Sequence, residues 1–372
     1  MDQYLTPRGI ELRKKVRNFM ESIENEVKNY AYHINKIQLY QYTNTTEFPF
    51  HLVPKIQELG VNGFTIKDHG GPGLNEIDTW AIVYEMAKID LSVSTFLMVH
   101  NSIGMQVVNY LGNEGQRARI LPDCLKLKKI MCFGLTEPEY GSDASSLKTT
   151  AKKVEGGYLL NGLKRWIGNA TFADYIVIWA RNEAEGNKIQ AFIVEKGADI
   201  TLENVFVPDN NRLEHAKDFN SANRILEHSR VGVAWLGAAS ACGAYEAALK
   251  YVLNRKQFGK QVASFQATQL KLSKMLGQCE MMVTLCMRIT ELVNQNKTTI
   301  GQIGRAKAIC TALSREVCAT ARELCGGNGI IIDNRVMKSF MDIEAIYTYE
   351  GTYEVNMLVS GREITGGIPA FK

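Results

Sequence analysis

Several common signatures of function are missing from this sequence. The eight cysteines form no C-x-x-C pair, and neither they nor the six histidines show the spacing of a zinc site. The net charge of +4 is small for 372 residues and there is no basic stripe, so we expect no nucleic-acid partner. These absences favour buried, reduced thiols in a reducing compartment and no metal centre.

The chain also has little that indicates a membrane span or export. Its longest stretch without Asp, Glu, Lys or Arg covers residues 91–113, but polar residues interrupt it, among them His100, Asn101 and Gln106. We interpret this stretch as a buried helix and expect no membrane span. The first residues show no secretory pattern and the last ones are not an S-K-L tail, so targeting stays open.

The residue patterns divide the chain into three parts. Up to about Leu127, apolar residues recur three and four apart, which predicts helices. Between Ile130 and about Pro208, short β-branched and aromatic runs alternate with Gly or Asn, which predicts strands, and the helical period returns from Phe219 onward. We therefore predict a mainly helical protein with a central β domain. The predicted domains are an N-terminal helical domain at 1–129, a middle β domain at 130–215 and a C-terminal helical domain at 216–372.

Four stretches could carry chemistry, although each also has a plain structural interpretation. GLTEPEYGSD at 134–143 is typical of a turn after a strand, and KRWIGNATFAD at 164–174 sets a Trp beside a Gly at a strand end. NRKQFGKQVASFQ at 254–266 could be a solvated helix connection, and ELCGGNGI at 323–330 a double-Gly helix end. None of the four contains the dinucleotide fingerprint or the P-loop.

A fifth stretch, AIYTYEGTYEV, places Glu350 in an aromatic and partly apolar turn. A carboxylate held beside Tyr347, Tyr349 and apolar neighbours is expected to have a raised pKa, which would make it a stronger base. The structural alternative is that Glu350 pairs with a cation.

In this order and at these separations, the stretches resemble the acyl-CoA dehydrogenase and oxidase superfamily from about Leu5 to the last residue. RWIGNATFAD, NVFVPD, RKQFG and IYTYEGTYEVNMLVSGREITG are similar to the plant-type peroxisomal short-chain acyl-CoA oxidase, and glutaryl-CoA dehydrogenase shares the last of these in outline. The resemblance implies a helical N-terminal domain, a β-barrel-like middle domain and a C-terminal four-helix bundle. It also implies FAD between the last two domains, a homodimer or homotetramer whose subunits share FAD sites, and a peroxisomal or mitochondrial-matrix location.

The implied reaction is the α,β-dehydrogenation of a short-chain acyl-CoA to trans-2-enoyl-CoA, a step of fatty acid β-oxidation. A side chain can remove the α proton, but only a cofactor can accept the β hydride, which is why flavin is implied. The resemblance places the base on Glu350. Some relatives carry the base just before an Arg in the helix that follows the β domain. Here Ser229 precedes Arg230, and a serine cannot replace a carboxylate.

The resemblance assigns further residues to the cofactor and the substrate. Those expected around the flavin and its pyrophosphate are Phe133, Leu135, Thr136, Gly141, Ser142, Trp166 and Gly168. Those expected at the FAD of a neighbouring subunit are Arg255, Gln257, Phe258, Gln266, Gly326 and Gly327, with Thr352 and Glu354 near this cofactor too. The acyl-CoA is expected beside Ser142, Arg230, Ser94, Tyr349 and Gly351.

The chain departs from the family pattern at Gly168, where most dehydrogenases carry a Thr that hydrogen-bonds the flavin. Loss of that side chain leaves space near the ring, through which O2 could reach the reduced cofactor. We therefore favour O2 as the electron acceptor, with an electron-transfer flavoprotein as the alternative.

Two more departures concern the substrate pocket. Ser94 stands where glutaryl-CoA dehydrogenase has an Arg for the distal carboxylate, so we predict a monocarboxylic substrate and no decarboxylation. The connection through Ala198 and Asp199 is shorter than the family normally has. Either a segment is missing from this sequence or the pocket has lost a wall. A catalytically silent structural or assembly subunit is therefore also an alternative.

Overall fold

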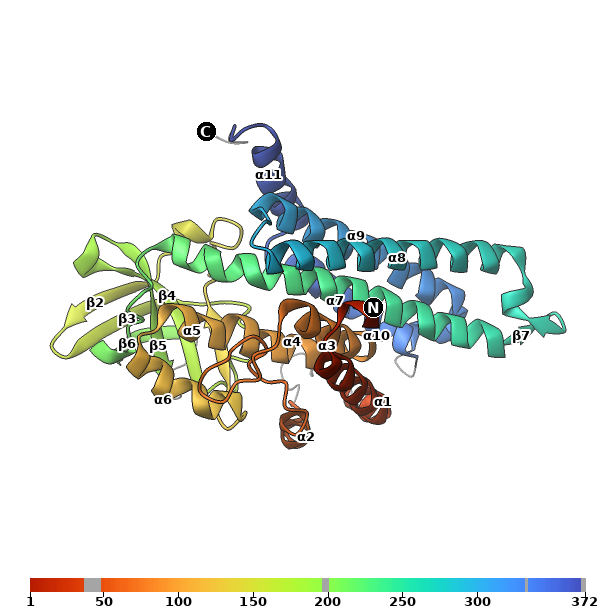
Figure 1. The fold of residues 1–372 in the computed structure, drawn as a ribbon, viewed down its shortest axis with the longest axis horizontal. Helices are drawn as coiled ribbons and strands as arrows, with labels where there is room; N and C mark the ends of the chain where they lie inside the picture. The colour runs from red at the N-terminus through yellow and green to blue at the C-terminus, as the bar shows by residue number, and fades with distance from the viewer. Residues whose placement is uncertain (37–47, 196–200, 332–333, 369–372) are drawn as a thin grey trace. The chain divides into compact units, whose positions relative to one another are not determined.

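The computed structural model describes residues 1–36, 48–195, 201–331 and 334–368, and the chain forms two compact units (Figure 1). The first unit is built from Met1–Val53, Asn75–Ser94 and Arg230–Lys372, and the second from Pro54–Leu74 and Thr95–Ser229. The predicted order of helices, a β domain and helices again is confirmed. The exact domain boundaries stay a prediction. The short connection at Ala198 and Asp199 lies outside the described residues.

The first unit is helical. Its helices are α1 (Pro7–Lys36), α3 (Glu76–Ile89), α7 (Phe219–Asn254, from Arg230 on), α8 (Gln266–Asn294), α9 (Ile300–Leu324), α10 (Arg335–Thr348) and α11 (Tyr353–Ile364). Helix α9 packs against α8, α10 and α11. Figure 1 shows α11 at one end of the α8–α9 pair and a small hairpin, β7 (Lys256–Gln257) and β8 (Lys260–Gln261), at the other end.

Local sequence explains where α9 begins. Thr299 caps it, because its side chain accepts the N–H of Gln302 while the Gln302 side chain accepts the N–H of Thr299. In the core of this unit, the indole of Trp235 donates to Thr290 Oγ1 at 2.9 Å and meets the ring of Tyr84 edge-on. All eight cysteines are buried and free of disulfides.

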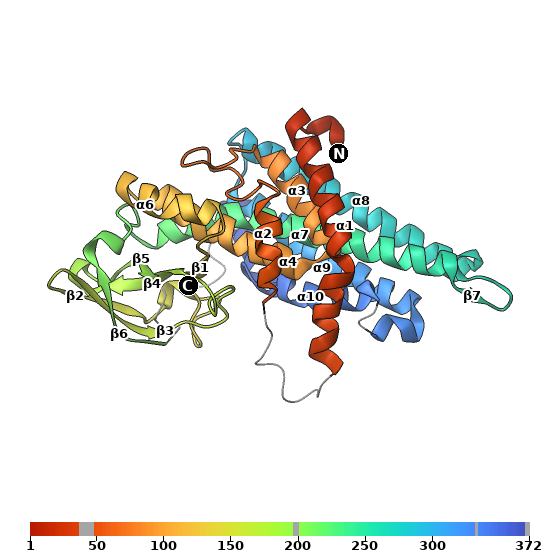
Figure 2. The same cartoon turned by 90° about the horizontal axis from the view of Figure 1, so that it is seen from below.

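Within the described residues, the second unit is built around a six-stranded sheet. Its strands are β1 (Met131–Gly134), β2 (Thr150–Val154), β3 (Gly157–Leu163), β4 (Tyr175–Asn182), β5 (Lys188–Glu195) and β6 (Thr201–Pro208). The strand order is β1-β4-β2-β3-β6, with β5 also paired to β4. Strand β4 is parallel to β1 and β2, and antiparallel to β5. Helices α5 (Gln106–Leu111) and α6 (Glu114–Leu125) lie along this sheet (Figure 2).

Both faces of strand β4 are buried. Val177 and Trp179 belong to one hydrophobic core, which also takes in residues of α5 and α6, whereas Ile176 and Ile178 belong to a second core that contains Phe192. Successive side chains of a strand point to opposite faces, so β4 anchors both cores at once. This explains why its sequence, YIVIWARN, shows a continuous apolar run instead of alternation.

The long uncharged stretch forms α4 (Leu91–Met98), a π-helical segment (Val99–Met105) and α5. In the described part of the chain, one helical stretch, Leu91–Leu111, is long and apolar enough to cross a membrane, and 78% of its most apolar window is buried inside the protein. This burial fits the interpretation as a core helix. Its π-helical segment packs against β1, where His100 Nδ1 accepts the N–H of Met131 at 3.0 Å.

Candidate active site

The first part of the candidate site is the turn between α10 and α11. Glu350 has a φ of 57° and Gly351 a φ of 90°, so both adopt the left-handed conformation. For a glutamate this costs on the order of 1–3 kcal/mol and is tolerated only where the surroundings impose it. A Cβ at position 351 would lie 2.9 Å from Asn356 Nδ2, which explains the glycine. Thr352 then caps α11 by accepting the N–H of Val355.

Two side chains bind the main-chain oxygens at the centre of this turn. Arg230 Nε, from α7, donates to the oxygen of Glu350 at 3.1 Å. Asn356 Nδ2, from α11, donates to the oxygens of Gly351 at 2.8 Å and Thr352 at 3.0 Å. Charged and amide donors therefore fix the backbone that carries Glu350. The structure thus places Arg230 against the turn of the predicted base. Its place beside the acyl-CoA stays a prediction.

A third donor, Lys307 of α9, lies beneath the same turn. Its side chain is fully buried, and Nζ donates to the oxygens of Tyr347 and Gly351, each at 2.7 Å. Burial lowers the pKa of Lys307 to about 8; the charge of Glu350 opposes this shift and that of Arg230 adds to it. The charges of Glu350 and Arg230 therefore both act on Lys307. The sequence next to Glu350 identifies neither of these two cations.

The aromatic neighbours are arranged differently from the simplest expectation. The ring of Tyr347 stacks on that of Tyr353, with centroids 6.2 Å apart, and the guanidinium of Arg315 lies 4.4 Å from its centre. The expected aromatic and apolar setting of Glu350 is thus incomplete, because the turn also lies against two cationic side chains, Lys307 and Arg230. Glu354 is exposed in the first turn of α11.

The residues predicted to reach a neighbouring subunit's cofactor lie together at the hairpin end of this unit. Phe258, at the tip of the β7–β8 hairpin, is 91% exposed, and its ring meets Phe265 edge-on. Arg255, Gln257, Gln266, Gly326 and Gly327 are exposed as well. Asn328, just after the two glycines, donates to Tyr251 OH at 2.8 Å and so joins this turn to the end of α7.

The residues at the hairpin end lie far from the turn of Glu350 in the same chain. Arg230 and Tyr251 are both on α7, and at 1.5 Å of rise per residue they are ~31 Å apart along the helix. The two predicted groups therefore do not come together within one copy of the first unit.

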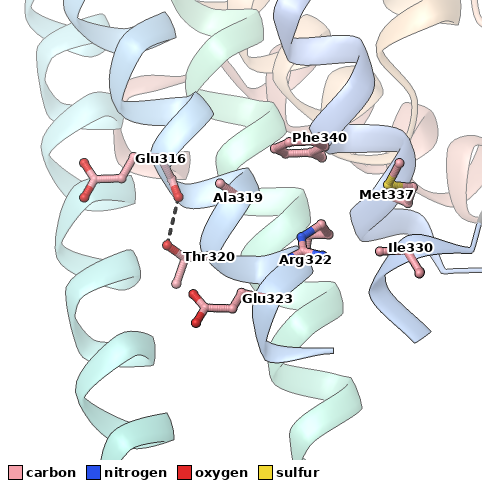
Figure 3. Close-up of a pocket in the computed structure, with 8 residues that line it drawn as sticks. All are labelled: Glu316, Ala319, Thr320, Arg322, Glu323, Ile330, Met337 and Phe340. Atoms are coloured by element: carbon pink, nitrogen blue, oxygen red, sulfur yellow. Dashed lines mark hydrogen bonds between the residues drawn. The ribbon is translucent and has the colours of Figure 1, made fainter. Parts of the chain in front are cut away.

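A cavity of about 550 Å³ opens near the same end, between the last turns of α9, the residues that follow it, and α10 (Figure 3). No residue predicted for the site lines it. Its lining residues are Glu316, Ala319, Thr320, Arg322, Glu323, Ile330, Met337 and Phe340.

The second unit holds the residues predicted for the flavin. Lys164 is buried and donates to the oxygen of Leu135 at 3.0 Å and to Glu137 Oε1 at 2.9 Å, and the N–H of Arg165 donates to the oxygen of Thr136. These bonds tie the end of β1 to the segment that leads to Trp166, so the structure brings two predicted stretches together. Lys164 and Glu137 themselves were missed from the sequence.

The buried charges of Lys164 and Glu137 each favour the ionised form of the other. Burial lowers the pKa of Lys164 to about 8, despite its attraction to Glu137. Burial alone would raise the pKa of Glu137, but the hydrogen bonds from Thr149 and Lys148 and the charge of Lys164 leave it below its usual value. Glu137 therefore stays ionised as an anchor inside the unit.

Trp166 and Gly168 form the exposed part of this region. The indole of Trp166 is 80% exposed, its φ is 61°, and the guanidinium of Arg165 lies 4.5 Å from the ring centre. Gly168 is exposed too, but a Cβ there would lie only 3.1 Å from Cγ2 of Val99. The space expected from the missing side chain is therefore partly filled by Val99.

The other predicted residues divide into exposed and buried ones. Gly141 and Ser142 are exposed in the loop between β1 and β2. The side chains of Phe133 and Leu135 are buried in the core that contains Trp179, so mainly their backbone is left for a ligand. Ser94, in the first unit, is buried and donates its hydroxyl to the oxygen of Asp90 at 2.7 Å.

Comparison with known proteins places these features in one family. Models of the acyl-CoA dehydrogenase N-terminal, middle and C-terminal domains match residues 6–128, 132–213 and 219–365. The chain belongs to the acyl-CoA dehydrogenase family. Members of this family are FAD-dependent oxidoreductases that act on acyl-CoA, and this chain is one of them.

Individual relatives span almost the whole acyl-CoA dehydrogenase chain. The caffeyl-CoA reductase–Etf complex subunit CarC of Acetobacterium woodii is 31% identical over 96% of this chain and 98% of its own length. A short-chain specific acyl-CoA dehydrogenase of Clostridium acetobutylicum is 30% identical over 98% of this chain and all of its own. The crystal structure of glutaryl-CoA dehydrogenase from Mycobacterium smegmatis has a TM-score of 0.91 and 27% identity, covering 100% of this chain and 98% of that one. Particular closeness to the plant-type oxidase stays a prediction.

The described residues fit the flavin that this acyl-CoA dehydrogenase family uses. Trp166 keeps most of its surface in water and has a strained backbone conformation, a combination that is typical of binding sites, and its exposed ring offers a planar face to a ligand such as a flavin. Exposed Gly168 lets such a ligand approach the backbone closely.

Proposed function

We propose that the protein oxidises a short-chain, monocarboxylic acyl-CoA to the trans-2-enoyl-CoA, with Glu350 as the base that removes the α proton. The observation that carries the proposal is the turn of residues 347–352, which holds a strained glutamate in place through donors from α7, α9 and α11. FAD, when bound, supplies the acceptor for the hydride that leaves the β carbon.

The chain's own residues divide the rest of the work. Glu350 must hold its carboxylate at the α carbon of the substrate, and the fixed turn limits the other positions it can take. We assign the main-chain N–H of Glu350 to the thioester oxygen, where negative charge develops as the α proton leaves. Trp166 is assigned to the flank of the flavin ring, in keeping with its exposed indole.

A short monocarboxylic substrate is supported by two observations. The Clostridium acetobutylicum relative is named as short-chain specific. Ser94 offers no positive charge for a distal carboxylate, and its hydroxyl already donates to the oxygen of Asp90, the residue just before its own helix. A buried carboxylate without a cation would cost several kcal/mol, so a glutaryl group is a poor substrate under this proposal.

For the electron acceptor we propose a partner protein of the electron-transfer flavoprotein kind. The relative from Acetobacterium woodii is named as a subunit of an Etf complex, and Val99 restricts the opening at Gly168. A second candidate is O2, which the exposed, side-chain-free Gly168 favours.

We further propose that the FAD site is shared between two copies of the chain in a homo-oligomer. The separation of ~31 Å along α7 supports this arrangement, because the Arg255 and Gly326 group cannot reach the base turn of its own chain. A dimer and a tetramer both satisfy this requirement.

The test follows the flavin colour of the purified protein. Butyryl-CoA added without oxygen should bleach the absorbance, and Glu350→Gln should slow bleaching by at least ~100-fold, because it removes the general base. Glu291→Gln, which neutralises an exposed carboxylate on α8, is the matched control and should bleach at the normal rate. A Glu350→Gln protein that bleaches like the wild type would contradict the base assignment.

The same sample distinguishes the acceptors and substrates. After anaerobic reduction, slow recolouring in air and fast recolouring with an electron-transfer flavoprotein support the proposed acceptor. Fast recolouring in air with stoichiometric peroxide supports O2 instead. If glutaryl-CoA bleaches the protein faster than butyryl-CoA, the monocarboxylic substrate is wrong.

A further inference from the structure

Lys307 is a buried cation to which the proposed function assigns no role in binding the substrate or accepting the proton. It is fully buried, and its hydrogen bonds within the described residues go to two main-chain oxygens. Lys164, the buried lysine of the other unit, instead forms an ion pair with Glu137 at 2.9 Å. A buried ammonium is costly unless other groups compensate for its lost hydration, so the position of Lys307 calls for an explanation.

The two acceptors of Lys307 stand on either side of Glu350. Tyr347 O belongs to the last turn of α10, and Gly351 O directly follows the base. One ammonium group therefore closes the backbone loop from which the Glu350 side chain projects. The centre of that loop is held separately by Arg230 and Asn356.

The charge of Lys307 acts on the same residue. Its pKa is lowered by burial to about 8, and the charge of Glu350 opposes this shift, so attraction between the two groups is part of the balance. Among the residues that the structure describes, the other charged or titratable groups recorded against Lys307 are Arg230, from α7, and Tyr347, whose ring centre is 5.9 Å from Nζ. Arg230 also favours the ionised carboxylate, so Lys307 adds to a field that keeps Glu350 ready to accept a proton.

We propose that Lys307 is a positioning residue for the base: it closes the strained turn around Glu350, and its positive charge favours the carboxylate form that can take the α proton. This inference rests on the proposed function of Glu350. Since Lys307 donates to the backbone of the turn and lies beneath it, its loss should lower kcat far more than it raises KM.

The experiment compares three replacements of Lys307 in the flavin-containing protein. Lys307→Met removes the charge and both hydrogen bonds, Lys307→Gln keeps an amide donor without the charge, and Lys307→Arg keeps both charge and donors. Thr311→Val is the matched control, because Thr311 is buried on α9 one turn away. Its hydroxyl bonds, within the described residues, go to the main-chain oxygens of Lys307 and Ala308 and not to the turn of Glu350.

The first readout is the pH profile of kcat/KM for butyryl-CoA oxidation. With the cation removed, Glu350 holds its proton to higher pH, so the acid limb should move up by about one pH unit in Lys307→Met and Lys307→Gln. At the plateau, kcat should fall ~10-fold in Lys307→Met and less in Lys307→Gln, with KM within about two-fold. Lys307→Arg and Thr311→Val should keep the wild-type limb.

The second readout needs no turnover. The pKa of Lys307 is about 8 in the folded protein and near 10.5 in the unfolded chain, so between these values only the unfolded chain binds the proton. The urea midpoint of the wild type should therefore gain more between pH 8 and 9.5 than that of Lys307→Met, whereas Thr311→Val should follow the wild type.

Three results would overturn the inference. One is an acid limb of folded Lys307→Met or Lys307→Gln that coincides with the wild type, and another is a shifted limb in Lys307→Arg. The third is equal pH dependence of the urea midpoint with and without Lys307. Failure of the proposed function can be told apart from failure of this inference by the bleaching test. In that case the wild-type protein does not bleach with butyryl-CoA, or Glu350→Gln bleaches at the normal rate.

Discussion

Acidification should destabilise the second unit through one histidine. His100 is fully buried, its Nδ1 accepts the N–H of Met131 and its Nε2 donates to the oxygen of Cys124, both at 3.0 Å. A neutral ring protonated on Nε2 satisfies both partners, whereas a second proton on Nδ1 would point at the N–H of Met131. Burial accordingly lowers the pKa of His100 to about 4.

The magnitude follows from the difference between folded and unfolded pKa values. The unfolded histidine titrates near 6.5, so between about pH 6.5 and 4 the unfolded chain binds a proton that the folded protein does not. The free energy of unfolding is then unaffected by His100 above pH 6.5 and falls as the pH drops toward 4. The full loss from this group is about 3 kcal/mol.

The assay is urea unfolding at pH 7 and pH 4.5 for the wild type and for His100→Gln, whose side chain can donate and accept but does not titrate. His215→Gln, which replaces an exposed histidine, is the control. Carboxylates contribute to acid destabilisation in all three proteins, so the difference isolates His100. If the wild type and His100→Gln lose stability in parallel over this range, His100 does not cause the acid destabilisation.

Two further substitutions test the second unit. Lys164→Met should cost about 3–5 kcal/mol of unfolding free energy, because it leaves Glu137 charged and buried without its partner. Adding Glu137→Gln should recover most of this loss. A loss below about 1 kcal/mol in Lys164→Met would contradict the prediction. Gly168→Thr should lower the free energy of unfolding by about 1–3 kcal/mol, because the new side chain crowds Val99. In a double-mutant cycle, Val99→Ala should remove much of this loss. Additive effects of the two substitutions would mean that Val99 does not limit the space at this position.

The sequence could predict what short-range patterns encode. The period of apolar residues separated the helices from the β domain, and the run Tyr349–Thr352 identified the turn of the candidate base because its residues are adjacent. Lys307 could not be found in this way, since it lies 40 and 44 residues from its two acceptors and reaches them only after α9, α10 and α11 have packed.

The expectations for the flavin region show the same limit. Trp166 and Gly168 were singled out by a local motif, and both are exposed. Phe133 and Leu135 were assigned to the same site, but their side chains are buried, because β1 and the residue that follows it pack into the core of the unit. The neighbour that restricts Gly168, Val99, comes from a helix far away in the sequence, so the missing side chain alone overstated the free space.

The length of helix α7 also fixes the distance between two parts of the first unit. Helix α7 carries Arg230, which binds the turn of Glu350, and Tyr251, which binds Asn328 just after the two glycines at 326 and 327. The helix is continuous between them. One inserted or deleted residue in that interval would change the spacing by 1.5 Å and rotate one end against the other by about 100°. Sequence length is therefore constrained between Arg230 and Tyr251, and evolution can vary the side chains of this interval far more freely than their number.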